Sequence, residues 1–129
     1  MSKVLLVEDV ESNRLLLRIM LEKLGHEAIL VDDGLAALTY LREAGEGSVD
    51  AVLMDLQLPV LDGLSATGRI REDGFVGLPI IAVTAHALPG DRARCLDAGM
   101  SAYLAKPFTV DELRQVLVEN GVASDLADA

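Results

Sequence analysis

The sequence has few of the residues that form disulfides or contact nucleic acids. Cys95 is the only cysteine among 129 residues, so an internal disulfide and a metal cluster of cysteines are both excluded. Tryptophan is absent, and the other aromatics are two tyrosines and two phenylalanines. A net charge of −10 repels nucleic acid and anionic membrane surfaces, so we expect neither as a partner.

Long apolar stretches are missing as well. No run approaches the roughly 20 residues that a membrane-spanning helix needs. The four apolar residues after Lys3 are too few for the core of a signal peptide. Linkers, internal repeats and low-complexity blocks are also absent. We therefore expect a cytoplasmic protein with one domain, residues 1–121, and a short acidic tail, residues 122–129.

The sequence does contain five short apolar runs separated by segments with helical periodicity. These predicted strands are residues 4–7, 28–31, 51–54, 80–83 and 102–105. Regular alternation of strands and helices is typical of a parallel sheet covered on both faces. The predicted fold class is α/β, a doubly wound five-stranded parallel sheet of order 2-1-3-4-5, which is the flavodoxin-like arrangement.

The intervening segments predict which residues the helices bury. In the first helix the expected buried face is Leu16, Ile19, Met20 and Leu24, with Gly25 as the stop. The second helix repeats leucine at three-residue spacing, at Leu35, Leu38 and Leu41. Residues 88–98 are a weaker helix candidate, with Leu88, Cys95 and Leu96 as its apolar residues. The last helix starts with the spacing of a capping box, from Thr109 to Glu112.

Each apolar run ends in a polar residue. Glu8 and Asp9 follow the first run, Asp55 the third, Thr84 the fourth and Lys106 the fifth. The carboxyl ends of parallel strands line the ligand crevice, and this strand order has its switch point between strands one and three. We therefore expect the three acids to converge there. The acidic pair after the second run, residues 32–33, is expected at the sheet edge, and we interpret it as a turn and the start of a helix.

Converging carboxylates require compensation. Two of them ~4 Å apart repel by about 4 kcal/mol at an effective dielectric near 20. A hard cation with oxygen ligands relieves this repulsion, and Mg²⁺ accepts one or two carboxylates together with water and phosphate oxygens. Asp55 beside Mg²⁺ can attack phosphorus and form an acyl phosphate. Lys106 and Thr84 offer an amine and a hydroxyl for the phosphoryl oxygens.

With these residues placed, the chain closely resembles the receiver domain of bacterial two-component response regulators. The resemblance covers about residues 3–119. Four strings carry it in the family's order: Val7-Glu8-Asp9; Met54-Asp55-Leu56-Gln57-Leu58-Pro59 with Asp62-Gly63; Val83-Thr84-Ala85-His86-Ala87; and residues 98–107, which end in Tyr103-Leu104-Ala105-Lys106-Pro107. Together they are highly specific.

The resemblance implies a role for each matching acid. Asp55 corresponds to the phospho-acceptor. Asp9 and Asp55 correspond to side-chain ligands of Mg²⁺, Gln57 to a ligand through its backbone carbonyl, and Glu8 to a residue that acts mostly through water.

The resemblance also implies a switch. Thr84 and Lys106 correspond to the residues that hold the phosphoryl oxygens, and Tyr103 to an aromatic residue that turns inward when Thr84 moves. Pro107 corresponds to a proline preceded by a cis peptide bond.

The implied partners are proteins. In the family the phosphoryl donor is a phosphohistidine on a sensor histidine kinase or a histidine phosphotransfer protein, and its helices are expected to dock near Val10, Asn13 and Arg14. A downstream protein target is expected on the face formed by the fourth helix, fifth strand and fifth helix. The chain is thus predicted to be a single-domain signalling switch and not an enzyme.

Four alternatives stay open at this point. The sequence could be a receiver domain excised from a hybrid kinase. An aspartyl-phosphate phosphatase usually has a second acid two residues after its nucleophile, where this chain has Gln57. A flavin- or nucleotide-binding protein needs a Gly/Ser/Thr-rich loop after the first strand, where this chain has acids. A receiver-like scaffold that is never phosphorylated is disfavoured by the complete residue set.

Overall fold

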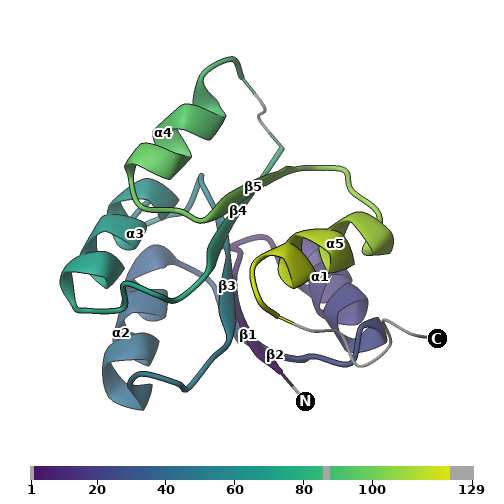
Figure 1. The fold of residues 1–129 in the computed structure, drawn as a ribbon, viewed down its shortest axis with the longest axis horizontal. Coiled ribbons are helices and arrows are strands. Elements are labelled where there is room, and N and C mark those ends of the chain that lie inside the picture. The colour runs from purple at the N-terminus through teal and green to yellow at the C-terminus, as the bar shows by residue number, and fades with distance from the viewer. Residues whose placement is uncertain (1, 86–87, 123–129) are drawn as a thin grey trace.

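A computed structural model of the chain describes residues 2–85 and 88–122, in which five strands alternate with five helices (Figure 1). The elements are β1 (Lys3–Val7), α1 (Glu11–Lys23), β2 (Glu27–Val31), α2 (Gly34–Ala44), β3 (Ala51–Asp55), α3 (Gly63–Glu72), β4 (Ile80–Thr84), α4 (Asp91–Asp97), β5 (Ala102–Ala105) and α5 (Val110–Glu119). The strands form one parallel sheet of order β2-β1-β3-β4-β5. This confirms the predicted fold and strand order.

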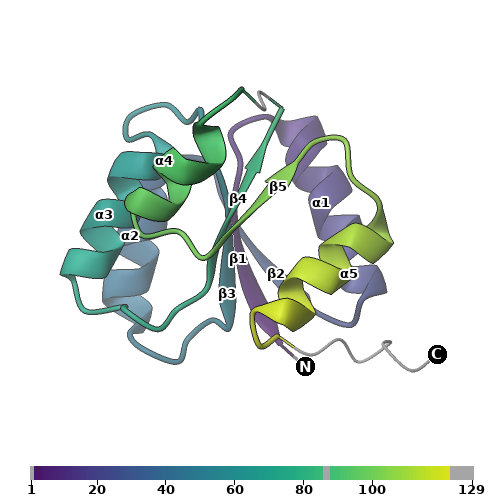
Figure 2. The ribbon, with the colours of Figure 1, turned by 45° about the horizontal axis from the view of Figure 1, so that its top comes forward.

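The sheet is covered on both faces (Figure 2). Helices α2, α3 and α4 lie on one side, and α1 and α5 lie on the other. Alternate residues of β1 pack into the two apolar layers of the core. Leu5 and Val7 pack toward α2 and α3, whereas Val4 and Leu6 pack toward α1 and α5. Full coverage explains why β1, β3 and β4 are almost continuous apolar runs instead of alternating patterns. Among the described residues, no helix combines the length and the apolar character needed to cross a membrane.

The predicted buried face of α1 is partly wrong. Leu16 and Ile19 were expected inside, but they are 58% and 42% exposed. The apolar residues that α1 and its C-terminal cap bury are Leu17, Met20, Leu21 and Leu24. Because α1 carries apolar side chains around most of its circumference, periodicity alone does not fix which stripe meets the sheet.

Two other helices also differ from prediction. In α2, Leu38 and Leu41 are buried as expected, but Leu35 in the first turn is exposed. The helix expected over residues 88–98 is shorter, Asp91–Asp97, and Leu88 and Leu96 are exposed. Gly90 precedes this helix with φ = 87°, a left-handed conformation that helical residues do not adopt, so the helix cannot extend further toward the N-terminus.

Two of the predicted helix starts are confirmed. Thr109 and Glu112 form the expected capping box at the start of α5. The Asp33 side chain accepts a hydrogen bond from the Ala36 N–H at 2.6 Å, which makes the acidic pair after β2 a helix start, as predicted. The predicted acidic tail falls almost wholly on residues 123–129, which lie outside the described residues.

Two glycines of α3 allow a matched test of how closely the helix approaches the site. A Cβ added at Gly63 would overlap the carbonyl oxygen of Asp55, whereas one added at Gly68 would meet nothing within 4 Å. We therefore expect Gly63→Ala to lower the free energy of unfolding by about 1–3 kcal/mol. Gly68→Ala should raise it by about 0.5–1 kcal/mol, because alanine is the better helix former. Denaturant melts of both variants check this, and equal effects would contradict the close approach.

Candidate functional site

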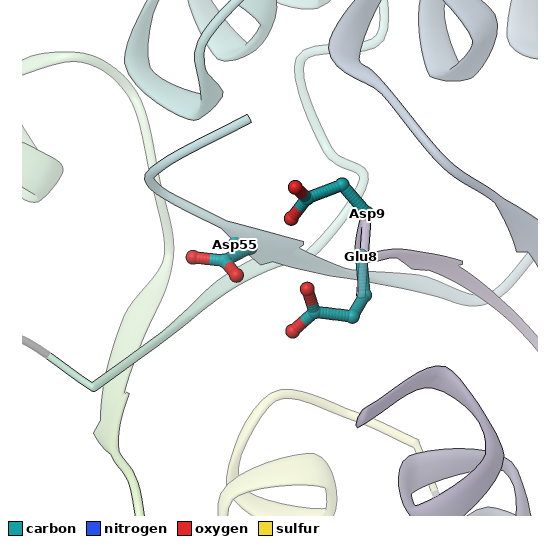
Figure 3. Close-up of side chains that lie close together, drawn as sticks. All are labelled: Glu8, Asp9 and Asp55. Atoms are coloured by element: carbon teal, nitrogen blue, oxygen red, sulfur yellow. The ribbon is translucent and has the colours of Figure 1, made fainter. Parts of the chain in front are cut away.

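Three acids meet at the carboxyl ends of two neighbouring strands (Figure 3). Glu8 and Asp9 directly follow β1, and Asp55 is the last residue of β3. One carboxylate oxygen from each residue lies within 4.8 Å of the other two. Glu8 is fully buried, Asp55 is 9% exposed and Asp9 faces solvent. The predicted convergence is therefore confirmed, and the cluster has one open side.

Lys106 supplies the positive charge of the cluster from the end of β5. Its Nζ donates to Glu8 Oε1 at 2.7 Å and lies 3.6 Å from Asp55 Oδ2. The other oxygen of Glu8, Oε2, accepts the Val10 N–H at 3.1 Å. Asp55 receives a weaker set: its Oδ1 accepts the Gln57 N–H at 3.2 Å, and Lys106 lies beyond hydrogen-bond distance.

This unequal pairing separates the pKa values of the two buried acids. Burial raises the pKa of Asp55, and the adjacent charge of Glu8 adds to the rise, which Lys106 only partly offsets. Burial also opposes ionisation of Glu8, but hydrogen bonds from Lys106 and the Val10 N–H outweigh it, so the pKa of Glu8 is lowered. Asp55 is thus the buried carboxylate whose charge is least well compensated.

The remaining predicted residues lie around this cluster. Thr84 ends β4 and is almost fully buried, and its carbonyl accepts the Lys106 N–H at 2.8 Å, which joins the ends of β4 and β5. Gln57 is exposed in the loop after β3. Tyr103 lies in β5 with its hydroxyl buried. The bond between Lys106 and Pro107 is cis, as the resemblance implied. His86 and Ala87 of the matching strings lie outside the described residues.

Sequence reasoning missed an apolar groove beside Lys106. The groove has a volume of about 450 Å³ and runs between α1 and the segment after β5. Its lining includes Leu16, Met20, Ala85 and Phe108, with Lys106 at one side. The groove was missed because Leu16 was expected inside. The sequence did contain a signal for the groove, because α1 carries more apolar residues than one buried stripe needs.

The donor set fits a hard divalent cation. The three carboxylates offer only oxygen ligands, and their charge exceeds that of Lys106. Because Asp9 is exposed, a bound ion could also keep water ligands, as Mg²⁺ prefers. Charge, ligand type and access therefore all agree with the predicted Mg²⁺ site.

Comparisons with known proteins are consistent with this geometry. Residues 4–118 match the family model described as the response regulator receiver domain. The chain is 41% identical over 114 residues to the sensor histidine kinase RcsC of Salmonella typhi, and the match covers 88% of this chain but 12% of that protein. It is 42% identical over 108 residues to the polar-differentiation response regulator DivK of Brucella anthropi, covering 83% of this chain and 85% of DivK.

A solved structure gives a further comparison. The receiver domain of the sensor histidine kinase PA1611 from Pseudomonas aeruginosa PAO1 has a TM-score of 0.81 and 49% sequence identity, covering 92% of this chain and 95% of that one. That structure has a magnesium ion coordinated in its active-site cleft. The chain thus spans nearly all of DivK and of this receiver, but about an eighth of RcsC.

The raised pKa of Asp55 predicts how stability depends on pH. In the folded chain, burial and the charge of Glu8 disfavour the ionised form of Asp55. The neutral side chain of Asp55→Asn avoids this cost, so without divalent cations the substitution should raise the free energy of unfolding. The gain should be absent below the unfolded pKa of about 3.9, grow as the pH rises toward the folded pKa, and then level off. Urea melts of both proteins with a chelator, across that range, check this. A gain independent of pH would contradict it.

Proposed function

This chain belongs to the response regulator receiver domain family, and from that premise we propose that it is a phosphorylation-controlled signalling switch of a two-component phosphorelay. The observation that carries the proposal is the site itself: a buried, poorly compensated carboxylate lies beside two further acids and one lysine. Such a site can accept a phosphoryl group and, once modified, differs sharply in charge and in hydrogen bonding.

Asp55 is the proposed phospho-acceptor. One of its carboxylate oxygens attacks the phosphorus of a phosphohistidine, and the phosphorus–nitrogen bond breaks as the phosphorus–oxygen bond forms. The released imidazole nitrogen keeps the electron pair and takes a proton from solvent. Asp55 suits this role because its pairing with Lys106 is loose, at 3.6 Å, so the carboxylate is not held in a tight ion pair.

Mg²⁺ is the proposed cofactor. The residues that would hold it are Asp9 and Asp55 through their side chains, Gln57 through its carbonyl, and Glu8 mostly through water. When bound, the ion neutralises charge on the transferring oxygens. The magnesium in the cleft of the 49% identical PA1611 receiver domain supports this assignment.

Lys106 and Thr84 are proposed to hold the phosphoryl oxygens, as the resemblance implies. Lys106 is already within 3.6 Å of Asp55 and can exchange its bond with Glu8 for one to an added oxygen. Thr84 and Lys106 lie at the ends of adjacent strands and are joined by a backbone hydrogen bond, so a shift of one is transmitted to the other. Tyr103 and Pro107 are the proposed switch residues that follow this shift.

The proposed phosphoryl donor is a sensor histidine kinase or a histidine phosphotransfer protein. The apolar groove beside Lys106, together with exposed Val10, Leu16 and Ile19 on and before α1, supports docking of the donor's helices next to the acids. Output to a downstream protein is proposed on the face formed by α4, β5 and α5. A turnover enzyme is not proposed, since the phosphoryl group ends on the protein's own side chain.

A second candidate is a receiver domain that works inside a hybrid kinase. The observation that favours it is 41% identity to the kinase RcsC, of which the matching region is a small part. The chemistry at Asp55 is the same in both cases. The two candidates differ in whether the histidine donor is on a separate protein or in the same one.

Binding of Mg²⁺ should stabilise the folded chain through the acidic site. At 100 times its dissociation constant, a ligand that binds only the folded state adds about 2.7 kcal/mol to the free energy of unfolding. We expect Asp9→Ala to lose most of this gain, because it removes one of the proposed ligands. Asp32→Ala, which removes an exposed acid after β2, should keep it. Thermal melts with Mg²⁺ and with a chelator measure the gain, and a full gain in Asp9→Ala would argue against the site.

Phosphorylation should be confined to one side chain. With Mg²⁺ and acetyl phosphate, intact-mass analysis of the wild type should show one added phosphoryl group that hydroxylamine removes. Asp55→Asn should show none, because an amide is not a nucleophile toward phosphorus, and Asp32→Asn should behave like the wild type. Unchanged labelling of Asp55→Asn would remove the assignment.

A further inference from the structure

The three acids of the site differ in what holds their carboxylates (Figure 3). Glu8 is fixed by Lys106 at 2.7 Å and by the Val10 N–H at 3.1 Å. Asp55 accepts a backbone N–H at 3.2 Å. Among the described residues, neither a hydrogen bond nor an ion pair holds the carboxylate of Asp9, which faces solvent. The direction of the Asp9 side chain therefore depends on the backbone that carries it.

The backbone at Asp9 is held by Arg14, which comes from α1. One guanidinium nitrogen of Arg14, Nη1, donates to the Glu8 carbonyl at 2.9 Å and to the Asp9 carbonyl at 3.0 Å. This nitrogen carries two hydrogens, so it can serve both acceptors at once. The two carbonyls belong to the peptide groups on either side of the Asp9 Cα. Because peptide groups are planar, holding both of them fixes φ and ψ of Asp9 and the direction in which its side chain leaves the backbone.

Other bonds hold the neighbouring positions but not these two carbonyls. The Glu8 N–H donates to the Val31 carbonyl at 3.2 Å, which ties the end of β1 to β2. Val10 stands at the cap position of α1 and makes no side-chain cap, since its side chain has no acceptor. Within the described part of the chain, the Glu8 and Asp9 carbonyls accept hydrogen bonds from Arg14 alone.

The charge of Arg14 and its hydrogen bonds have opposite consequences for a cation at the acids. A positive charge near the site repels a divalent cation, so as a charge alone Arg14 weakens binding. A group that orients a ligand strengthens binding, because the ligand does not have to be ordered when the ion arrives. Removal of Arg14 therefore tightens Mg²⁺ binding in the first case and weakens it in the second.

We propose that Arg14 is a positioning residue of the Mg²⁺ site: by holding the peptide groups on both sides of Asp9, it orients the solvent-facing carboxylate toward the cation. Groups behind the direct ligands commonly set ligand orientation in metal sites, and their loss lowers metal affinity. The role of Arg14 rests on the proposed function, which makes Asp9 a ligand. It adds a residue to which that function assigns no part in metal binding.

The first test is a titration with Mg²⁺ alone, followed by calorimetry or by NMR. Arg14→Met should raise the dissociation constant about tenfold. Arg14→Lys should regain part of the affinity, because an ammonium group can donate to both carbonyls. Arg18→Met is the matched control. It removes the same charge one turn further along α1, where the Arg18 Nε has no hydrogen-bond partner among the described residues, and should leave the constant within about twofold. Unchanged or tighter binding in Arg14→Met would overturn the proposal.

The second test asks whether Arg14 acts through Asp9. In an Asp9→Ala background, Arg14→Met should change the dissociation constant less than about twofold, because no carboxylate is left to orient. A further tenfold loss there would contradict the proposed role. If Arg14→Met does not fold in urea melts, Arg14→Lys takes its place, and its loss of affinity should likewise vanish in the Asp9→Ala background.

A third measurement needs no metal. With a chelator present, the NMR order parameter of the Asp9 amide should be near 0.85, the value of rigid backbone, in the wild type. It should fall toward about 0.6 in Arg14→Met, while that of Asp55 stays unchanged. An Asp9 amide that is equally rigid in both proteins would count against Arg14 as its support.

Phosphorylation separates the role of Arg14 from the proposed function. With acetyl phosphate, Arg14→Met should modify Asp55 more slowly at low Mg²⁺ and regain most of the rate when Mg²⁺ saturates. A loss of rate that Mg²⁺ does not restore would overturn the role. If the wild type accepts no phosphoryl group, the proposed function fails, and the Mg²⁺ affinities still decide the role of Arg14. If labelling is normal but Arg14→Met binds Mg²⁺ as tightly as the wild type, only the role of Arg14 is overturned.

Discussion

The ion pair between Lys106 and Glu8 is the interaction on which the site depends. It joins residues 98 positions apart at 2.7 Å and places a cation among three carboxylates that would otherwise repel one another. The pairing is one-sided within the described part of the chain: Glu8 also accepts the Val10 N–H, whereas Asp55 accepts the Gln57 N–H and lies 3.6 Å from the lysine. The same pocket of the folded chain therefore contains one acid whose charge is well compensated, Glu8, and one whose charge is poorly compensated, Asp55.

The parallel sheet makes this arrangement rigid. Because β1 lies between β2 and β3, the residues that follow β1 meet the last residue of β3 at one edge. Two apolar layers, one under α2 and α3 and the other under α1 and α5, fix the strands from both sides. An added charge at Asp55 can hardly be relieved by movement of the strands. We expect the change to pass outward instead, to the side chains around the site.

Helix α4 is held by side chains at both ends. Arg71 donates to the Gly99 carbonyl in the turn after the helix, and Asp91 in its first turn accepts the Leu88 N–H. A phosphorylation-controlled switch needs two discrete packings that differ by little free energy. Among the residues that the structure describes, the buried Tyr103 hydroxyl has no hydrogen-bond partner, so the packing seen here does not satisfy every polar group.

Much of the fold could be predicted because its signals are local. The five apolar runs became strands with shifts of at most one residue, and the side chains of Asp33 and Thr109 begin helices where their spacing indicated. The errors in buried faces have one physical cause: α1 and the first turn of α2 carry more apolar residues than the core can accept. A repeat of three or four residues then fits more than one face, and only packing against the sheet selects it. The wrong start of α4 has another cause, the left-handed backbone at Gly90.

The sequence by itself determined the strand order and the convergence of Glu8, Asp9 and Asp55. The order follows from the regular alternation of five apolar runs with helical segments, and the convergence follows from the acids that end the first and third runs. Tertiary structure alone decided that Lys106 pairs more closely with Glu8 than with Asp55, that Leu16 borders an open groove, and that Arg71 holds the turn after α4. These outcomes depend on ångström-scale distances between segments far apart in the chain. Periodicity and spacing carry no information about such distances.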